Sequence, residues 1–172
     1  MAASADVVAA DGGVRKRRPL PRSSEEKIAE GQRLKSKGND YFKRGQFKKA
    51  AYRYHKVFLF VNGLTASDEN MAQYAGSHVL SKEASLEVKE LKASVHNNLA
   101  MTFLKQSKGA EALDAADKCL AIQPSNFKAK FRRAQAFTLL RDFDRANAVL
   151  LELRDVTSAG GSDAEAEGDK LA

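Results

Sequence analysis

Five polar side chains have the types and the helical spacing needed to bind a pair of carboxylates. They are Lys35, Asn39, Asn98, Lys128 and Arg132. Lys35 with Asn39, and Lys128 with Arg132, form i, i+4 pairs that share one helix face. Lys and Arg supply charge-assisted hydrogen bonds, while an Asn amide satisfies remaining lone pairs without adding charge. A chain that ends in Asp offers such a target, because its main-chain and side-chain carboxylates lie close together.

An internal repeat indicates which elements must position these side chains. A trio of a small residue, an aromatic residue and an alanine occurs three times: Gly38, Tyr41 and Ala50; Ala100, Phe103 and Ala112; Ala134, Phe137 and Ala146. The second and third copies are 34 residues apart and the first and second are 62 apart, so 28 residues are inserted after the first unit. The units are expected at about residues 31–64, 93–126 and 127–156, with the insertion at about 65–92.

Each unit is predicted to be a helical hairpin, and the fold class is all-α. Apolar residues recur at helical spacing, and Gly45, Gly109 and Asp142 are interpreted as the turns between paired helices. One hairpin cannot bury its apolar face alone, so three must stack to form a continuous core. Cys119 lies on the apolar stripe of the middle unit and is interpreted as a core residue, not a nucleophile.

Stacked hairpins normally curve, so that the first helix of each unit lines a concave groove, and the five carboxylate-binding candidates are expected on that face. Asn98 and Arg132 are 34 residues apart and therefore hold equivalent places in units two and three. Asn is a weak helix former because its side chain competes with the backbone for hydrogen bonds. A polar role in the groove is the simpler explanation for Asn98.

Composition limits the chain to one compact domain with two tails. It has 172 residues, 43% hydrophobic and 30% charged, with no apolar run long enough for a membrane span. A single cysteine and the lack of an Asn-x-Ser/Thr sequon fit a reducing compartment. The expected location is the cytoplasm, and the basic cluster from Arg15 to Arg22 leaves nuclear import open.

The net charge of +7 is unevenly distributed along the chain. Residues 1–23 are expected to form a disordered basic tail, 24–156 the helical domain and 157–172 a disordered acidic tail. The middle part carries the largest positive charge, which favours an anionic partner. Within the insertion, Ser81 is a candidate N-cap for a lengthened helix.

The repeat resembles the tetratricopeptide repeat. The resemblance rests on the 34-residue period, on G-N-D-Y-F and G-Q-F-K-K-A-A in the first unit, and on L-A-I-Q-P in the second. It implies three hairpins stacked as a right-handed superhelix. Two places depart from the pattern, since Leu34 stands where tryptophan is usual and Ser158 lies near the expected closing proline. The long first connection is similar to that in repeat domains of FK506-binding immunophilins and of the tetratricopeptide repeat protein nine family.

The five groove candidates resemble the two-carboxylate clamp of chaperone-binding tetratricopeptide domains. The matching segments are L-K-S-K-G-N, N-L-A-M and F-K-A-K-F-R-R. The resemblance implies an adaptor or co-chaperone that binds the Glu-Glu-Val-Asp tail of the seventy- or ninety-kilodalton heat-shock chaperones.

Enzymatic activity is not expected, and neither a metal nor a cofactor is implied. His55, His78 and His96 match no metal-ligand spacing, and the sequence has neither a Cys-x-x-Cys pair nor a phosphate-binding loop. Two alternatives to chaperone binding stay open. One is binding of nucleic acid or another anionic surface through the basic arm and core, and the other is docking of a different acidic C-terminus.

Overall fold

The computed structural model describes residues 7–8, 14–15, 20–21, 23–62, 64 and 80–165, and within these ranges it describes side chains from Leu20 to Arg154. Six helices dominate this part of the chain. Their bounds are α1 Ser24–Lys43, α2 Phe47–Val61, α3 Lys82–Leu104, α4 Gly109–Ile122, α5 Phe127–Leu139 and α6 Phe143–Glu165. Within the described part, no helix is both long and apolar enough to cross a bilayer.

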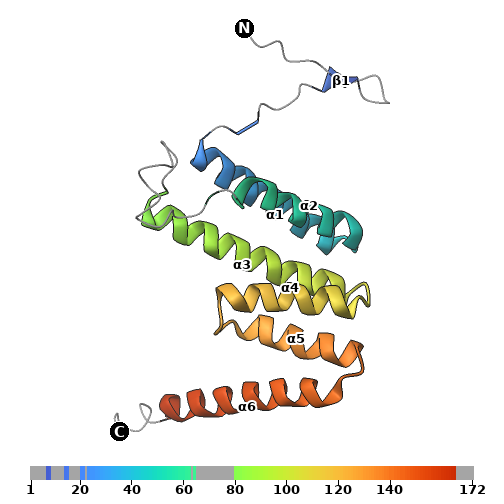
Figure 1. The fold of residues 1–172 in the computed structure, drawn as a ribbon, viewed down its shortest axis with the longest axis vertical. Coiled ribbons are helices and arrows are strands. Elements are labelled where there is room, and N and C mark those ends of the chain that lie inside the picture. Colours follow the sequence, from blue (N-terminus) through green and yellow to red (C-terminus); the bar gives the residue numbers. More distant parts are fainter. Residues whose placement is uncertain are drawn as a thin grey trace.

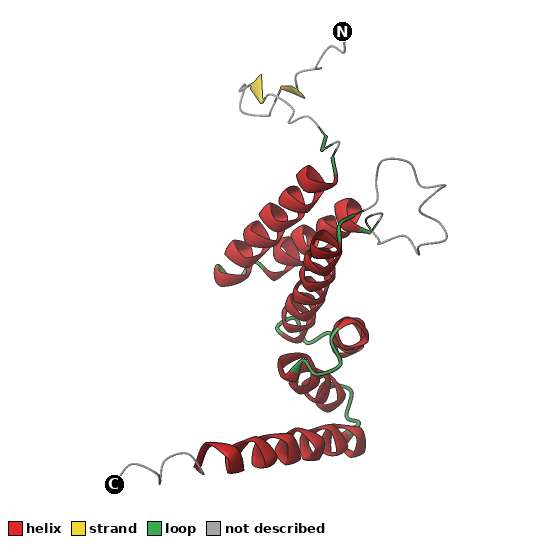
Figure 2. Ribbon diagram, turned by 90° about the vertical axis from the view of Figure 1, so that its left-hand side faces the viewer, coloured by secondary structure: helices red, strands yellow, loops and turns green. Residues whose placement is uncertain are grey.

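The helices form three antiparallel hairpins stacked along the long axis of the molecule (Figure 1). Figure 2 shows the same stack from the side. The first helices α1, α3 and α5 run in the same direction, and α3 contacts both of the others. This arrangement confirms the all-α class and the hairpin organisation, while the right-handed superhelical twist stays a prediction.

Four helices begin at side-chain caps that the sequence encodes, and at α6 the Asp142 carboxylate accepts from the Arg145 amide at 3.1 Å. Ser23 and Glu26 form a reciprocal capping box at the start of α1. The Ser81 hydroxyl accepts a hydrogen bond from the Ala84 amide, which confirms the predicted N-cap of the long helix α3. Asn126 caps α5 in the same way through Ala129. Caps of this kind satisfy backbone amides that have no partner within the helix.

The turns inside the three hairpins share one geometry. Gly45, Ser107 and Arg141 have positive φ angles of 71°, 57° and 61°, and they are equivalent in the repeat. After each of them, the next amide donates to the carbonyl of the repeat's aromatic residue at 2.9–3.0 Å, as in a Schellman motif. The predicted turn at Gly109 is therefore wrong, since Gly109 begins α4 and lies against Leu140. Ser107 and Arg141 were missed because glycine is not obligatory at this place.

Residues of the repeated trio lie at the contacts between helices. All of its alanines are at most 3% exposed, and Phe137 is 2% exposed. Cys119 is fully buried, which confirms its interpretation as a core residue, and burial raises the pKa of its thiol. Packing requires glycine at position 38, because a Cβ there would lie 2.4 Å from Cε1 of Tyr54. The first hairpin thus pairs the smallest residue with a large aromatic ring.

The two ends of the domain differ from the predicted tails. Most of the N-terminal tail lies outside the described residues, but β1 (Val7–Val8) pairs antiparallel with β2 (Val14–Arg15), which the sequence did not predict. Helix α6 continues to Glu165, well past residue 156, where the sequence placed the end of the domain. Once a helix has been nucleated, each further residue adds a hydrogen bond, so an Ala- and Glu-containing extension can follow despite Gly160 and Gly161.

Candidate peptide-binding groove

Three of the five predicted carboxylate-binding residues line one pocket. Asn39 from α1, Asn98 from α3 and Arg132 from α5 surround a volume of about 290 Å³. Each comes from the first helix of a different hairpin, so stacking brings together residues that are distant in sequence. The pocket also contains residues that the sequence analysis did not select, namely Phe42, Lys43, Tyr54 and Met101.

The two predicted lysines do not line this pocket. Lys35 lies one turn before Asn39 on α1, and Lys128 lies one turn before Arg132 on α5. Because α1 and α5 run in the same direction, both lysines are displaced toward the same end of the groove (Figure 1). Lys128 is exposed and Lys35 is partly buried.

The two pocket asparagines are joined by a direct hydrogen bond. Asn98 Nδ2 donates to Asn39 Oδ1 at 3.1 Å, and the hydroxyl of Tyr54 donates to the same oxygen at 2.7 Å. Burial is the main reason that the pKa of Tyr54 rises to about 12. The hydroxyl therefore keeps its proton at neutral pH. Asn98 thus has a structural partner in addition to its position in the groove.

Arg132 is held by a main-chain acceptor. Its Nη1 donates to the carbonyl oxygen of Asn97 on α3 at 2.8 Å. Burial lowers the pKa of Arg132, but a guanidinium begins so high that it stays charged. One donor of the planar fork is thus occupied, and the remaining N–H groups are available to a ligand. The arrangement places two cationic side chains, Arg132 and Lys43, and two amides around a small volume.

Tyr54 is the main pocket residue that sequence reasoning missed, and the repeat contains a signal for it. The equivalent positions in units two and three are Ala116 and Leu150. Only the first unit has a hydroxyl there, and only the first unit has glycine in place of the small alanine of the trio. A comparison of the three units position by position would have indicated a special contact between Gly38 and Tyr54.

Comparison with known proteins supports the same architecture. Peptidyl-prolyl cis-trans isomerase FKBP4 is 32% identical over 126 residues in Rattus norvegicus and 31% identical in Homo sapiens. The C-terminal tetratricopeptide-containing domain of a Plasmodium falciparum FK506-binding protein superposes with a TM-score of 0.66 at 21% identity, covering 80% of this chain and 83% of that one. The chain has a tetratricopeptide repeat fold.

Other comparisons define how far this tetratricopeptide similarity extends. A multi-domain immunophilin from Arabidopsis thaliana matches with a TM-score of 0.64 at 23% identity, covering 83% of this chain and 52% of that one. The FKBP4 match covers 73% of this chain, which spans only 25% of the length of those relatives. No family model matches the sequence.

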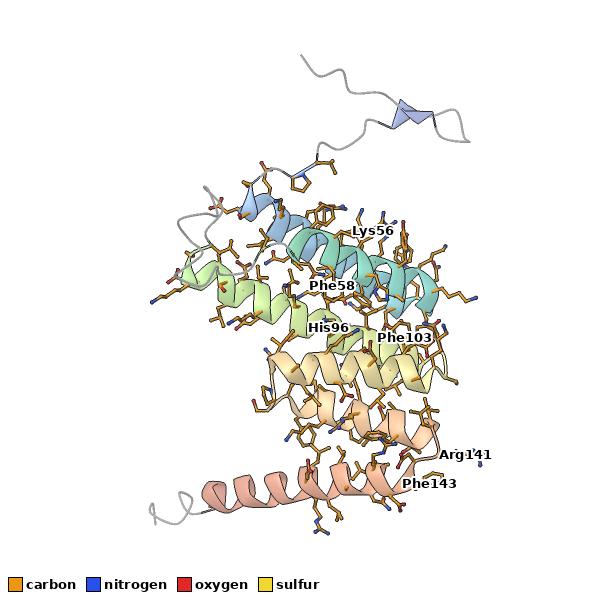
Figure 3. The ribbon with its side chains drawn as sticks, in the orientation of Figure 1. Lys56, Phe58, His96, Phe103, Arg141 and Phe143 are labelled. Atoms are coloured by element: carbon orange, nitrogen blue, oxygen red, sulfur yellow. The ribbon has the colours of Figure 1, made fainter. Side chains whose placement is uncertain are left out.

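The tetratricopeptide domain has a second pocket, which is lined by two histidines. It has a volume of about 400 Å³ and lies between α2, α3 and α4. His96 stacks on Phe58 with ring centroids 4.5 Å apart (Figure 3). Burial, with a smaller contribution from Lys118, lowers the pKa of His96 to about 4. Burial likewise lowers the pKa of His55. Both rings are therefore expected to be neutral at pH 7.

The low pKa of His96 predicts that acid destabilises the domain. Between about pH 6.5 and pH 4 the unfolded chain binds a proton at His96 that the folded chain does not, so stability falls as the pH falls through this window. The loss is expected to be on the order of 1–2 kcal/mol after allowance for solvent screening. Urea unfolding at pH 7 and pH 4.5 measures it, and His96→Gln should be less pH-sensitive. Equal pH sensitivity of both proteins would contradict the prediction.

Proposed function

We propose that this protein is a non-catalytic adaptor or co-chaperone whose groove binds the acidic C-terminal tail of a heat-shock chaperone. The observation that carries the proposal is the convergence of Asn39, Asn98 and Arg132 on one pocket. Each belongs to a different repeat, and together they offer hydrogen-bond donors and positive charge. Two adjacent carboxylates are the ligand chemistry that such a set favours.

The proposed ligand is a chain ending in Glu-Glu-Val-Asp. Its terminal residue has a main-chain and a side-chain carboxylate, which the guanidinium of Arg132 and the two amides would bind. Lys35 and Lys128, at the end of the groove, would interact with the same carboxylates or with the preceding Glu residues. A cytoplasmic location would give access to this partner, and it stays a prediction.

Calorimetric titration with an acidic peptide ending in Met-Glu-Glu-Val-Asp tests the proposal. We expect micromolar binding, and we expect amidation of the C-terminus to abolish it, because amidation removes one of the two carboxylates. A scrambled peptide of the same charge serves as the control. If the free acid and the amide bind equally well, the groove does not recognise a chain end, and the clamp assignment is wrong.

A second candidate function is supported by the outer face of α2. Lys49 and Arg53 lie over the ring of Tyr41, and Lys56 lies 4.8 Å from the ring centroid of Tyr52. Within the described residues, none of these three cations forms an ion pair with a carboxylate. Such a face suits nucleic acid or another anionic surface. Affinity that falls steeply with salt and ignores the state of the peptide C-terminus would favour this function.

A further inference from the structure

The direction of the Asn39 amide affects how strongly the pocket binds a carboxylate. An asparagine side chain has an accepting oxygen at one end and a donating NH2 group at the other. If the NH2 group faces the groove, it donates to a carboxylate. If the oxygen faces the groove, it repels a carboxylate and accepts instead from an amide. The residues behind Asn39 therefore affect what the groove binds.

Two donors from other residues of the pocket occupy the Asn39 oxygen. The Tyr54 hydroxyl donates to Oδ1 at 2.7 Å, and Asn98 Nδ2 donates to it at 3.1 Å. A carbonyl oxygen has two lone pairs, so these contacts satisfy it. Among the described residues, no hydrogen bond uses the Asn39 NH2 group, so its hydrogens are left for a ligand.

The position of the Tyr54 hydroxyl is fixed by packing. The Tyr54 side chain is 1% exposed. Its ring lies so close to Gly38 that a Cβ there would be 2.4 Å from Cε1 and 2.7 Å from Cδ1. The ring therefore cannot shift toward α1 or rotate out without opening a cavity. Because the Tyr54 hydroxyl is fixed, it holds the Asn39 side-chain amide in one orientation. A mobile donor would allow both orientations of the amide.

We propose that Tyr54 is a positioning residue that strengthens the preference of the groove for a free carboxylate, by holding the Asn39 amide with its NH2 group toward the ligand. The inference rests on the proposed function, because it concerns the same pocket and the same class of peptide. Tyr54 does not need to touch the peptide. It acts through Asn39, and the hydrogen bond from Asn98 assists it.

Tyr54→Phe tests this role, because it removes the donor and retains the ring that packs against Gly38. We expect the affinity for the free-acid peptide to fall about three- to tenfold, the loss associated with one hydrogen bond. The ratio of the affinities for the free-acid and the C-terminally amidated peptide should also fall. Without the Tyr54 hydroxyl, the Asn39 side chain can turn its oxygen toward the groove. Tyr52→Phe is the matched control. It removes the same atom from an exposed tyrosine on the outer face of α2 and should change neither value.

A double-mutant cycle separates positioning from general destabilisation. In an Asn39→Ala background, Tyr54→Phe should change peptide affinity by less than about twofold, because the residue through which Tyr54 acts is absent. An undiminished loss in that background would overturn the proposal. A wild-type chain that binds neither peptide would overturn the proposed function, and the specificity role of Tyr54 with it.

NMR of the unliganded protein tests the orientation of the amide without any peptide. The two side-chain NH2 signals of Asn39, assigned by their disappearance in Asn39→Ala, should be sharp in the wild type. Tyr54→Phe should shift or broaden both, because turning about the Cβ–Cγ bond changes the surroundings of the NH2 group. Signals that stay unchanged in Tyr54→Phe would show that Tyr54 does not hold the amide and would overturn the proposal.

Discussion

Replacing Arg132 by alanine is expected to weaken binding of an acidic peptide ending in Asp by about tenfold to a hundredfold. A charged hydrogen-bonding partner contributes about 1.5–3 kcal/mol, and each 1.4 kcal/mol corresponds to a tenfold change in affinity. The effect should be large because the guanidinium is partly buried beside Asn39 and Asn98, where water screens it less than on the surface. Titration calorimetry with the free-acid peptide measures it.

Lys130→Ala is the matched control for this variant. It removes the same charge from the same helix, two residues away, and Lys130 is not among the residues that line the pocket. Lys130→Ala should change the affinity for the peptide only slightly, because it lowers the overall positive charge of the domain without removing a pocket residue. Lys128→Ala, which removes a predicted clamp cation, should weaken binding as well. If both Lys128→Ala and Arg132→Ala bind the peptide with unchanged affinity, the groove does not act as a carboxylate clamp.

Arg132→Lys separates charge from geometry. Lysine retains the positive charge but lacks the planar fork that can donate to Asn97 and to a ligand at the same time. Partial recovery of affinity relative to alanine would measure the contribution of charge alone. Full recovery would mean that the fork geometry does not matter to the ligand.

The hairpins and two of the seven residues that line the pocket were predictable because they follow from periodicity. Residues separated by one repeat occupy equivalent places, so the 34-residue interval predicted that Asn98 and Arg132 would share one face of the stack. The structure places both residues at the same pocket. Burial of Ala100 and Ala134 follows from the same spacing, because helix packing needs a small residue once per repeat.

Contacts that cross between helices without a repeat signature were not predictable. Arg132 donates to a main-chain carbonyl, and every residue has one, so nothing in the sequence distinguishes Asn97 as its acceptor. The hydrogen bond from Tyr54 to Asn39 depends on the relative height of α1 and α2, which the turn at Gly45 sets. Sequence spacing defines positions along one helix, and packing defines the offset between two.

Gly38→Ala is expected to destabilise the domain by about 2 kcal/mol, although alanine is the better helix former. The helical propensity of alanine would contribute about 1 kcal/mol in favour of the variant. Against it, the new Cβ would lie 2.4 Å from Cε1 of Tyr54, a residue that is 1% exposed and has no space to move. Overpacking at such a site typically costs about 1–3 kcal/mol, and so short a distance places this site at or above the upper end. Urea denaturation and a melting temperature lowered by roughly 5–10 °C would measure the loss.

Two further variants identify the ring of Tyr54 as the cause. In a Tyr54→Leu background, Gly38→Ala should be neutral or stabilising, because the ring that obstructs the Cβ is gone and the propensity of alanine remains. Gly45→Asn is the control for glycine in general. A Cβ at Gly45 meets nothing within 4 Å, and Ser107 and Arg141 adopt the same left-handed conformation in the other two turns. It should therefore cost less than about 1 kcal/mol. Equal costs for Gly38→Ala with and without the ring would mean that a different contact requires glycine at this position.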